Sequence, residues 1–143
     1  MDSRTISDEY AKIGAELIKK EPSLQWIAES DITIVYLSST AELKKGGKLI
    51  LGQCEKIPDK YKWAIPADFT ITLFEPNITG ISKEQLKILI LHELLHVGNG
   101  EIIPHDVEDF RVIIDRYGLD WANKNEPNII DAEQLHRFKI KGI

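Results

Sequence analysis

One predicted helix limits what this chain can fold into more than any other segment. Ser82 and Gln85 have the spacing of a capping box, in which each side chain accepts a hydrogen bond from the other residue's backbone N–H. Apolar side chains then cover most of the circumference through position 97, and Gly98 is expected to end the helix in a left-handed conformation. A helix that is apolar on nearly all sides must be buried, so we expect the other elements to pack around it.

Three polar side chains interrupt this apolar helix. His92 and His96 are four residues apart, so both imidazoles leave the same helix face and can share one metal ion. Glu93 lies about 100° around the helix from His92, where a general base is needed to take a proton from metal-bound water. Burying these groups without a function would cost several kcal/mol. The pattern therefore predicts that His92 and His96 are metal ligands and that Glu93 is the catalytic base.

A catalytic zinc site needs a third protein ligand and an open position for water. His105 is the preferred third ligand, because imidazole is a good zinc donor and the loop over 98–104 can fold it back toward the helix. Asp106, Glu108 and Asp109 are alternatives, or partners that orient the imidazole N–H groups. Histidine-rich tetrahedral sites favour zinc, and manganese, iron and cobalt stay open as alternatives.

Residues outside the helix help to decide which class of metal site this is. The long metzincin motif would require glycine at 99 and histidine at 102, where this chain has Asn99 and Ile102. Tyr117 and His136 are candidates for stabilising a negatively charged oxygen in the transition state. Cys54 is the only cysteine, which excludes an intrachain disulfide and a multi-cysteine zinc site, and its apolar neighbours predict a buried structural thiol.

The remaining elements predict an α+β fold. Thr5 and Asp8 have capping-box spacing before an amphipathic stretch, and Asp131 is placed to cap a short helix through Phe138. The order of elements predicts an N-terminal helix, a small, mostly antiparallel sheet of about three strands, the buried HExxH helix and a following helix. The expected helices cover residues 6–20, 82–97 and 105–117, and the expected strands cover 31–38, 48–55 and 69–74.

The overall composition is that of one globular domain. The chain has 143 residues, of which 43% are hydrophobic and 29% charged, so residues 1–143 are expected to form a single domain. A formal net charge of −5 argues against nucleic-acid binding through phosphate contacts. The basic cluster of Lys44, Lys45 and Lys48 is interpreted as a solvated loop. Because the apolar runs are too short to span a bilayer and the N-terminus is polar, we expect a cytoplasmic protein without membrane contact.

Four segments carry a resemblance to a known family. The run over 91–97, followed by the run over 104–110, resembles the putative phage metallopeptidase family. The segments 51–58 and 67–73 resemble that family's two strands before the active-site helix. The resemblance extends over roughly residues 30–120 and implies a compact zincin-like domain, similar to SprT-like minimal metallopeptidases.

The resemblance also implies roles for individual residues. Carried over by position, His92, His96 and His105 are expected to be zinc ligands and Glu93 the catalytic base. In zincin-like folds the strand before the active-site helix lies at the edge of the cleft and pairs with an extended substrate. The segment 69–74 would be that strand, and an ordinary core strand is the alternative.

The functional hypothesis is hydrolysis of peptide bonds by a zinc-dependent metallopeptidase, with Glu93 as general base and a peptide or protein as substrate. Two alternatives stay open. One is a catalytically idle, metal-stabilised binding or regulatory module. The other is an ImmA-like protease that cuts a single repressor protein.

Overall fold

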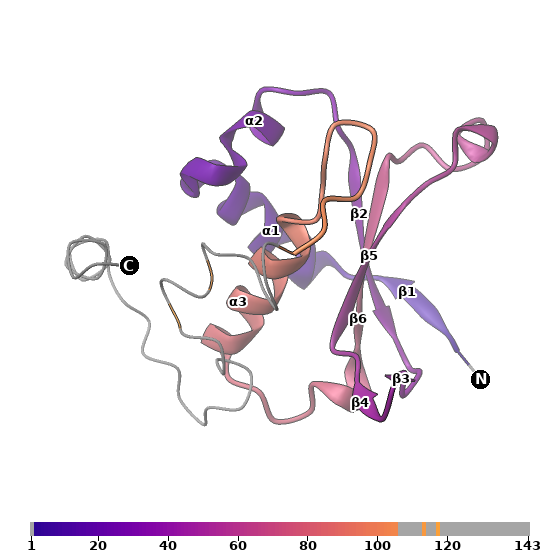
Figure 1. The fold of residues 1–143 in the computed structure, drawn as a ribbon, viewed down its shortest axis with the longest axis vertical. Helices are drawn as coiled ribbons and strands as arrows, with labels where there is room; N and C mark the ends of the chain where they lie inside the picture. The colour runs from indigo at the N-terminus through magenta and orange to yellow at the C-terminus, as the bar shows by residue number, and fades with distance from the viewer. Residues whose placement is uncertain (1, 106–112, 114–116, 118–143) are drawn as a thin grey trace.

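The computed structural model describes residues 2–105 together with Ile113 and Tyr117. The α-helices of the described part of the chain lie on one face of the main sheet (Figure 1). None of the described helices is long and apolar enough to cross a membrane. The elements in chain order are β1 (Arg4–Ile6), α1 (Asp8–Lys20), η1 (Pro22–Leu24), α2 (Gln25–Ala28), β2 (Ile34–Ser39), β3 (Lys44–Lys45), β4 (Lys48–Leu49), β5 (Gly52–Lys56), η2 (Asp59–Tyr61), β6 (Phe69–Phe74), η3 (Glu75–Asn77) and α3 (Lys83–Leu94).

The main sheet has four strands in the order β1–β2–β6–β5, and β3 and β4 form a separate two-stranded sheet. β1 and β2 pair antiparallel, β2 and β6 parallel, and β5 and β6 antiparallel. The predicted α+β class is confirmed. The prediction of about three strands is wrong, because β1 adds a fourth strand; its three residues are too few to give a periodic signal in the sequence.

Helix α1 begins later than the sequence pattern predicts. Ser7 is the N-cap, and its hydroxyl accepts a hydrogen bond from the Tyr10 N–H at 3.2 Å. The prediction that Thr5 caps this helix is wrong, because Thr5 pairs with Ser38 in the sheet and its backbone is extended.

The predicted strand over 48–55 is divided between two sheets. The Ile50 N–H donates to the Leu43 carbonyl at 2.9 Å and closes the hairpin of β3 and β4. The Asn77 amide donates to the carbonyls of Leu43 and Ile50, at 2.9 and 2.7 Å, and fixes the base of this hairpin. The basic cluster is exposed, as expected of solvated residues, but it lies in strands rather than in a loop: Lys44, Lys45 and Lys48.

Strand β6 is internal rather than at the sheet edge. It lies between β2 and β5, so the interpretation of residues 69–74 as the edge strand that pairs with substrate is wrong. Five of its six residues are buried, so both faces of this strand are covered. The edge strand on this side of the sheet is β5.

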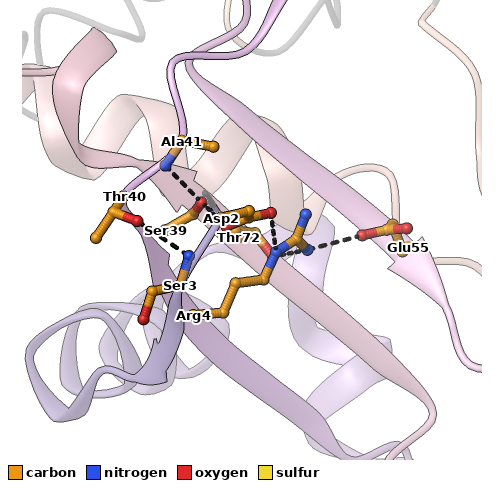
Figure 2. Close-up of polar contacts among 8 residues, drawn as sticks. All are labelled: Asp2, Ser3, Arg4, Ser39, Thr40, Ala41, Glu55 and Thr72. Atoms are coloured by element: carbon orange, nitrogen blue, oxygen red, sulfur yellow. Dashed lines mark hydrogen bonds and ion pairs between the residues drawn. The ribbon is translucent and has the colours of Figure 1, made fainter.

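Arg4 covers part of the sheet face opposite the helices. Its guanidinium donates to Asp2 at 3.0 Å, to the Thr72 hydroxyl at 3.3 Å and to Glu55 at 3.4 Å (Figure 2). It also lies 5.8 Å from the centroid of the Phe74 ring. One side chain from β1 therefore reaches across β6 to β5, which explains why Thr72 and Phe74 are only 0% and 1% exposed.

The opposite face carries the hydrophobic core, in which α1 approaches β2 closely. Tyr36 of β2 is 6% exposed and packs against Gly14 of α1. A Cβ atom at Gly14 would lie 2.2 Å from the Tyr36 hydroxyl oxygen, far inside van der Waals contact. The absence of a side chain at position 14 therefore sets how close α1 can come to the sheet.

We predict that Gly14→Ala lowers the free energy of unfolding. Helix propensity alone would stabilise the protein by about 1 kcal/mol, but the clash with buried Tyr36 should reverse the sign and give a net loss of about 1–3 kcal/mol. Urea denaturation followed by circular dichroism measures this loss. Lys12→Ala, at an exposed position of the same helix, is the matched control and should change stability by at most about 0.5 kcal/mol. A Gly14→Ala protein more stable than wild type would contradict this packing.

Candidate metal centre

Helix α3 begins as the sequence predicts and ends earlier. The capping box is confirmed: the Gln85 N–H donates to the Ser82 hydroxyl at 3.1 Å, and the Ser82 N–H donates to the Gln85 side chain at 2.9 Å. The helix ends at Leu94, not at position 97, and Gly98 is not left-handed; among the described residues nearby, Gly100 is, with φ 83°. A Cβ at Gly98 would lie 2.6 Å from the Glu101 carbonyl oxygen, so this glycine instead permits a close backbone approach.

The chain after α3 folds back on itself and positions His96. The His96 N–H donates to the Glu93 carbonyl at 3.1 Å. A last hydrogen-bonded turn therefore follows the end of α3 and holds His96. Val97 and Ile102 form an antiparallel bridge, and the Ile103 N–H donates to the His96 carbonyl at 2.7 Å. This return brings His105 back to the end of α3, as the sequence analysis expected of the loop.

The three histidines predicted as ligands lie together. One ring nitrogen from each of His92, His96 and His105 lies within 4.8 Å of the others. The Nε2 atoms of His92 and His105 are 2.9 Å apart, and the ring centroids of His96 and His105 are separated by 4.5 Å. These side chains come from the helix, from the turn after it and from the end of the return loop, so one backbone arrangement gathers all three.

A hydrogen bond fixes the proton on His96. Its Nδ1 lies 2.6 Å from the Ile103 carbonyl oxygen. Because a carbonyl oxygen only accepts hydrogen bonds, Nδ1 must carry a proton, and in the neutral imidazole Nε2 then keeps its lone pair. Orienting a ligand imidazole through its other nitrogen is the usual arrangement at protein metal sites.

The donor set fits a tetrahedral zinc ion. With Zn–N bonds of about 2.0–2.1 Å, two nitrogens on one tetrahedral ion lie about 3.3 Å apart. The 2.9 Å separation between His92 and His105 is close to this value, and small ring rotations would bring it into agreement. Three imidazoles leave the fourth position open to water or substrate. The role of the three histidines as metal ligands stays a prediction.

Glu93 lies beside the histidine cluster and is almost fully buried. It is 4% exposed, and its Oε2 atom is 4.0 Å from the His92 Nε2. Strand β5 lies against it at Gly52, where an added Cβ would be 3.2 Å from Oε2 and 3.3 Å from Cγ of Glu93. The same Cβ would be 2.8 Å from a methyl carbon of Leu73. Gly52 thus leaves the space that the Glu93 carboxylate occupies.

The histidines and Glu93 open into one pocket of about 350 Å³. One wall is the segment over 49–54, which runs from β4 into β5, and the other is α3 with the return loop. Cys54 lines this pocket and is half-buried. Burial, and then the nearby carboxylates of Glu93 and Glu55, raise the pKa of the Cys54 thiol, so it stays protonated at neutral pH. Cys54 is not part of the cluster of donor atoms that His92, His96 and His105 form.

The other predicted site residues do not join this pocket or lie outside the described part of the chain. Tyr117 is half-buried against the hydrophobic core and is not among the residues that line the pocket. Ile113 and Tyr117 have helical backbones, in the segment where a helix was predicted. The other residues fall outside the described part: Asp106, Glu108, Asp109, His136 and the predicted C-terminal helix after Asp131.

Two parts of the site were missed by the sequence analysis. The Ile103 carbonyl has no side-chain signature, so its contact with His96 could not be found in a single sequence. Gly52 did carry a signal, because a glycine inside a strand often marks a place where another group approaches the backbone closely. Its partner, Glu93, was identified only for its chemistry.

We predict that Gly52→Ala destabilises the protein and leaves its metal content unchanged. The added methyl group would press on Leu73, which is 0% exposed, and overpacking of this kind costs about 1–3 kcal/mol. Urea denaturation measures the loss, and elemental analysis measures the metal. Gln53→Ala is the control, because alternation along the strand points that side chain to the opposite face of the sheet. A Gly52→Ala protein as stable as wild type would show that Leu73 and Glu93 do not fill the space beside Gly52.

Comparison with known proteins agrees with the resemblance found in the sequence. No curated protein and no solved structure matches the chain significantly. A family model described as "Putative phage metallopeptidase" matches residues 3–128, which is most of the chain and includes the three clustered histidines, Glu93 and strand β5. The chain therefore belongs to the putative phage metallopeptidase family.

Proposed function

We propose that this protein is a zinc-dependent peptidase whose site is formed by His92, His96, His105 and Glu93. The observation that carries the proposal is the meeting of three imidazoles with a buried carboxylate in a single pocket beside a sheet edge. Histidine clusters without an adjacent base suit structural zinc, whereas a neighbouring carboxylate and an open fourth position suit hydrolysis. Membership of the metallopeptidase family supports the same chemistry.

Each residue has a defined task in this reaction. The imidazoles of His92, His96 and His105 would hold the ion, with the Ile103 carbonyl keeping His96 in the required tautomer. Zinc bound there supplies Lewis-acid polarisation of the peptide carbonyl and acidifies water. Glu93 accepts a proton from the attacking water as the new C–O bond forms, and delivers a proton to the leaving amine as the C–N bond breaks.

The outer edge of β5, with which no described strand pairs, offers a place for the substrate backbone. The Phe74 N–H donates to the Leu51 carbonyl, and the Ile57 N–H donates to the Asp68 carbonyl, at opposite ends of the β5–β6 ladder. Alternation along an antiparallel ladder then turns the backbone groups of the intervening even-numbered residues away from β6. An extended peptide could pair with these groups, and two of them line the pocket. The residues concerned are Gly52, Cys54 and Lys56.

The first test of this proposal is metal content. Protein purified without chelator should contain about one zinc per chain, and His105→Ala should lose most of it, since two imidazoles hold zinc far less tightly than three. Elemental analysis gives the stoichiometry. His136→Ala, which changes the fourth histidine of the chain, is the matched control and should retain zinc. Wild-type protein that takes up no stoichiometric metal, even when zinc is supplied, would refute the proposal.

The second test separates metal binding from turnover. Glu93→Gln should keep zinc and lose about 10²–10⁴-fold in cleavage rate, because the amide cannot accept the proton of the attacking water. Cleavage of mixed peptide libraries, read by mass spectrometry, measures the rate. Glu101→Gln, an exposed carboxylate in the return loop, serves as the control. Zinc-loaded wild-type protein that cleaves neither libraries nor candidate protein substrates would favour the idle module, and an unimpaired Glu93→Gln protein would disprove the mechanism.

A further inference from the structure

The hairpin of β3 and β4 carries a concentration of positive charge beside the pocket. We call residues 44–49 the lysine hairpin. Four of its six residues form strands with exposed side chains on Lys44, Lys45 and Lys48, although the whole chain has a net charge of −5. An acidic protein that gathers three lysines within five positions has a local potential opposite to its overall charge.

The pairing within the hairpin places like charges opposite each other. Lys45 and Lys48 are cross-strand partners, an arrangement that destabilises a strand pair. Lys44 forms an exposed ion pair with Glu42 at 3.4 Å. A hairpin this short gains little from packing, so the repulsion is unfavourable for folding alone. It is favourable for binding a negatively charged group.

The lysine hairpin is fixed relative to the pocket. Asn77, from the turn after β6, donates hydrogen bonds to the carbonyls on both sides of the hairpin base, those of Leu43 and Ile50. The pocket wall begins at Leu49, the residue directly after Lys48. The hairpin is therefore held next to the pocket wall, which it joins at Leu49, rather than on a mobile loop.

We propose that the lysine hairpin binds acidic side chains of the peptide substrate, next to the segment that enters the histidine site. This inference rests on the proposed function, because it assumes that a peptide lies along the wall formed by 49–54. An extended peptide advances about 3.3 Å per residue, so a chain leaving Gly52 toward the hairpin passes Lys48 after roughly four residues. The preferred substrate then carries Asp or Glu about two to five residues from the scissile bond.

Acidic peptide fits these observations better than nucleic acid does. The hairpin joins the pocket at an apolar stretch of the pocket wall, Leu49, Ile50 and Leu51. A phosphate backbone would need a longer basic surface than one hairpin, and the overall negative charge opposes it. A peptide with an aliphatic segment followed by carboxylates matches both the apolar wall and the lysine hairpin.

The test measures binding to full-length, zinc-loaded Glu93→Gln protein, so that bound peptide is not cleaved. The probes are fluorescent extended peptides with an aliphatic centre and either glutamate or glutamine flanks. The glutamate peptide should bind about tenfold more tightly than the glutamine peptide, and high salt should remove the difference. Lys45→Glu combined with Lys48→Glu should abolish or reverse the preference, and the corresponding glutamine substitutions should give an intermediate result.

The control is a double variant with the same change in charge at a remote place. Lys12→Glu combined with Lys19→Glu makes the same change in charge on exposed residues of α1, outside the lysine hairpin, and should keep the preference for glutamate. Circular dichroism checks that all variants are folded. Equal affinity for the two peptides, or equal loss in both double variants, would overturn the inference. A single-stranded oligonucleotide of matched charge that binds the hairpin more tightly than the peptide would also overturn it.

This result and the test of peptidase activity are independent. A hairpin-dependent preference for acidic peptide, together with no cleavage by wild type, would keep the binding surface and reject the peptidase. Cleavage by wild type with no effect of the hairpin lysines would keep the peptidase and reject the acidic preference.

Discussion

The burial of α3 between the sheet and α1 is the constraint on which the rest of this structure depends. Ile90 is 0% exposed and Leu91 1%, so the helix can neither rotate nor slide without opening the core. The two residues that follow in the sequence, His92 and Glu93, are consequently held in fixed directions. The free energy that orients the site comes from apolar side chains that take no part in its chemistry.

After the end of α3 at Leu94, the site depends on backbone contacts rather than on apolar packing. The bridge between Val97 and Ile102, and the pairing of His96 with Ile103, turn the chain through a short loop and return it to α3. His96 and His105, nine positions apart in the sequence, thereby meet at one point. The backbone of Ile103 performs two tasks. Its N–H closes the loop by donating to the His96 carbonyl, and its carbonyl oxygen sets the tautomer of the His96 ring.

The sequence was most informative where one local pattern determines one local structure. The capping box at Ser82 and the course of β6 over residues 69–74 were predicted because periodicity and hydrogen-bonding side chains act within a few residues. The three clustered histidines and the neighbouring Glu93 were identified from their spacing and their chemistry. These are short-range signals, and they carried most of the candidate site.

Features that depend on distant contacts were predicted less well. Residues 4–6 became a strand because β2 was there to pair with them, and this overrode a plausible cap at Thr5. The helix stopped at Leu94 although its sequence could continue, because the return loop competes for the backbone groups of His96 and Gly98. The order of strands in the sheet was not predicted either. Nothing in residues 69–74 indicates that β5 forms the edge and β6 an internal strand. Each of these outcomes was decided by a partner elsewhere in the chain.

The two edges of the main sheet are treated differently, and this difference bears on function. At the β1 edge the strand is only three residues long, and a short edge limits pairing with other chains. From that strand, Arg4 reaches across the outer face and ties the N-terminal segment to Glu55 of β5. The β5 edge instead borders the pocket, with Glu93 close behind Gly52. An edge that is left unpaired is a liability for aggregation, and no described strand pairs with this one. Its position beside the histidines is consistent with the proposal that a peptide pairs with it.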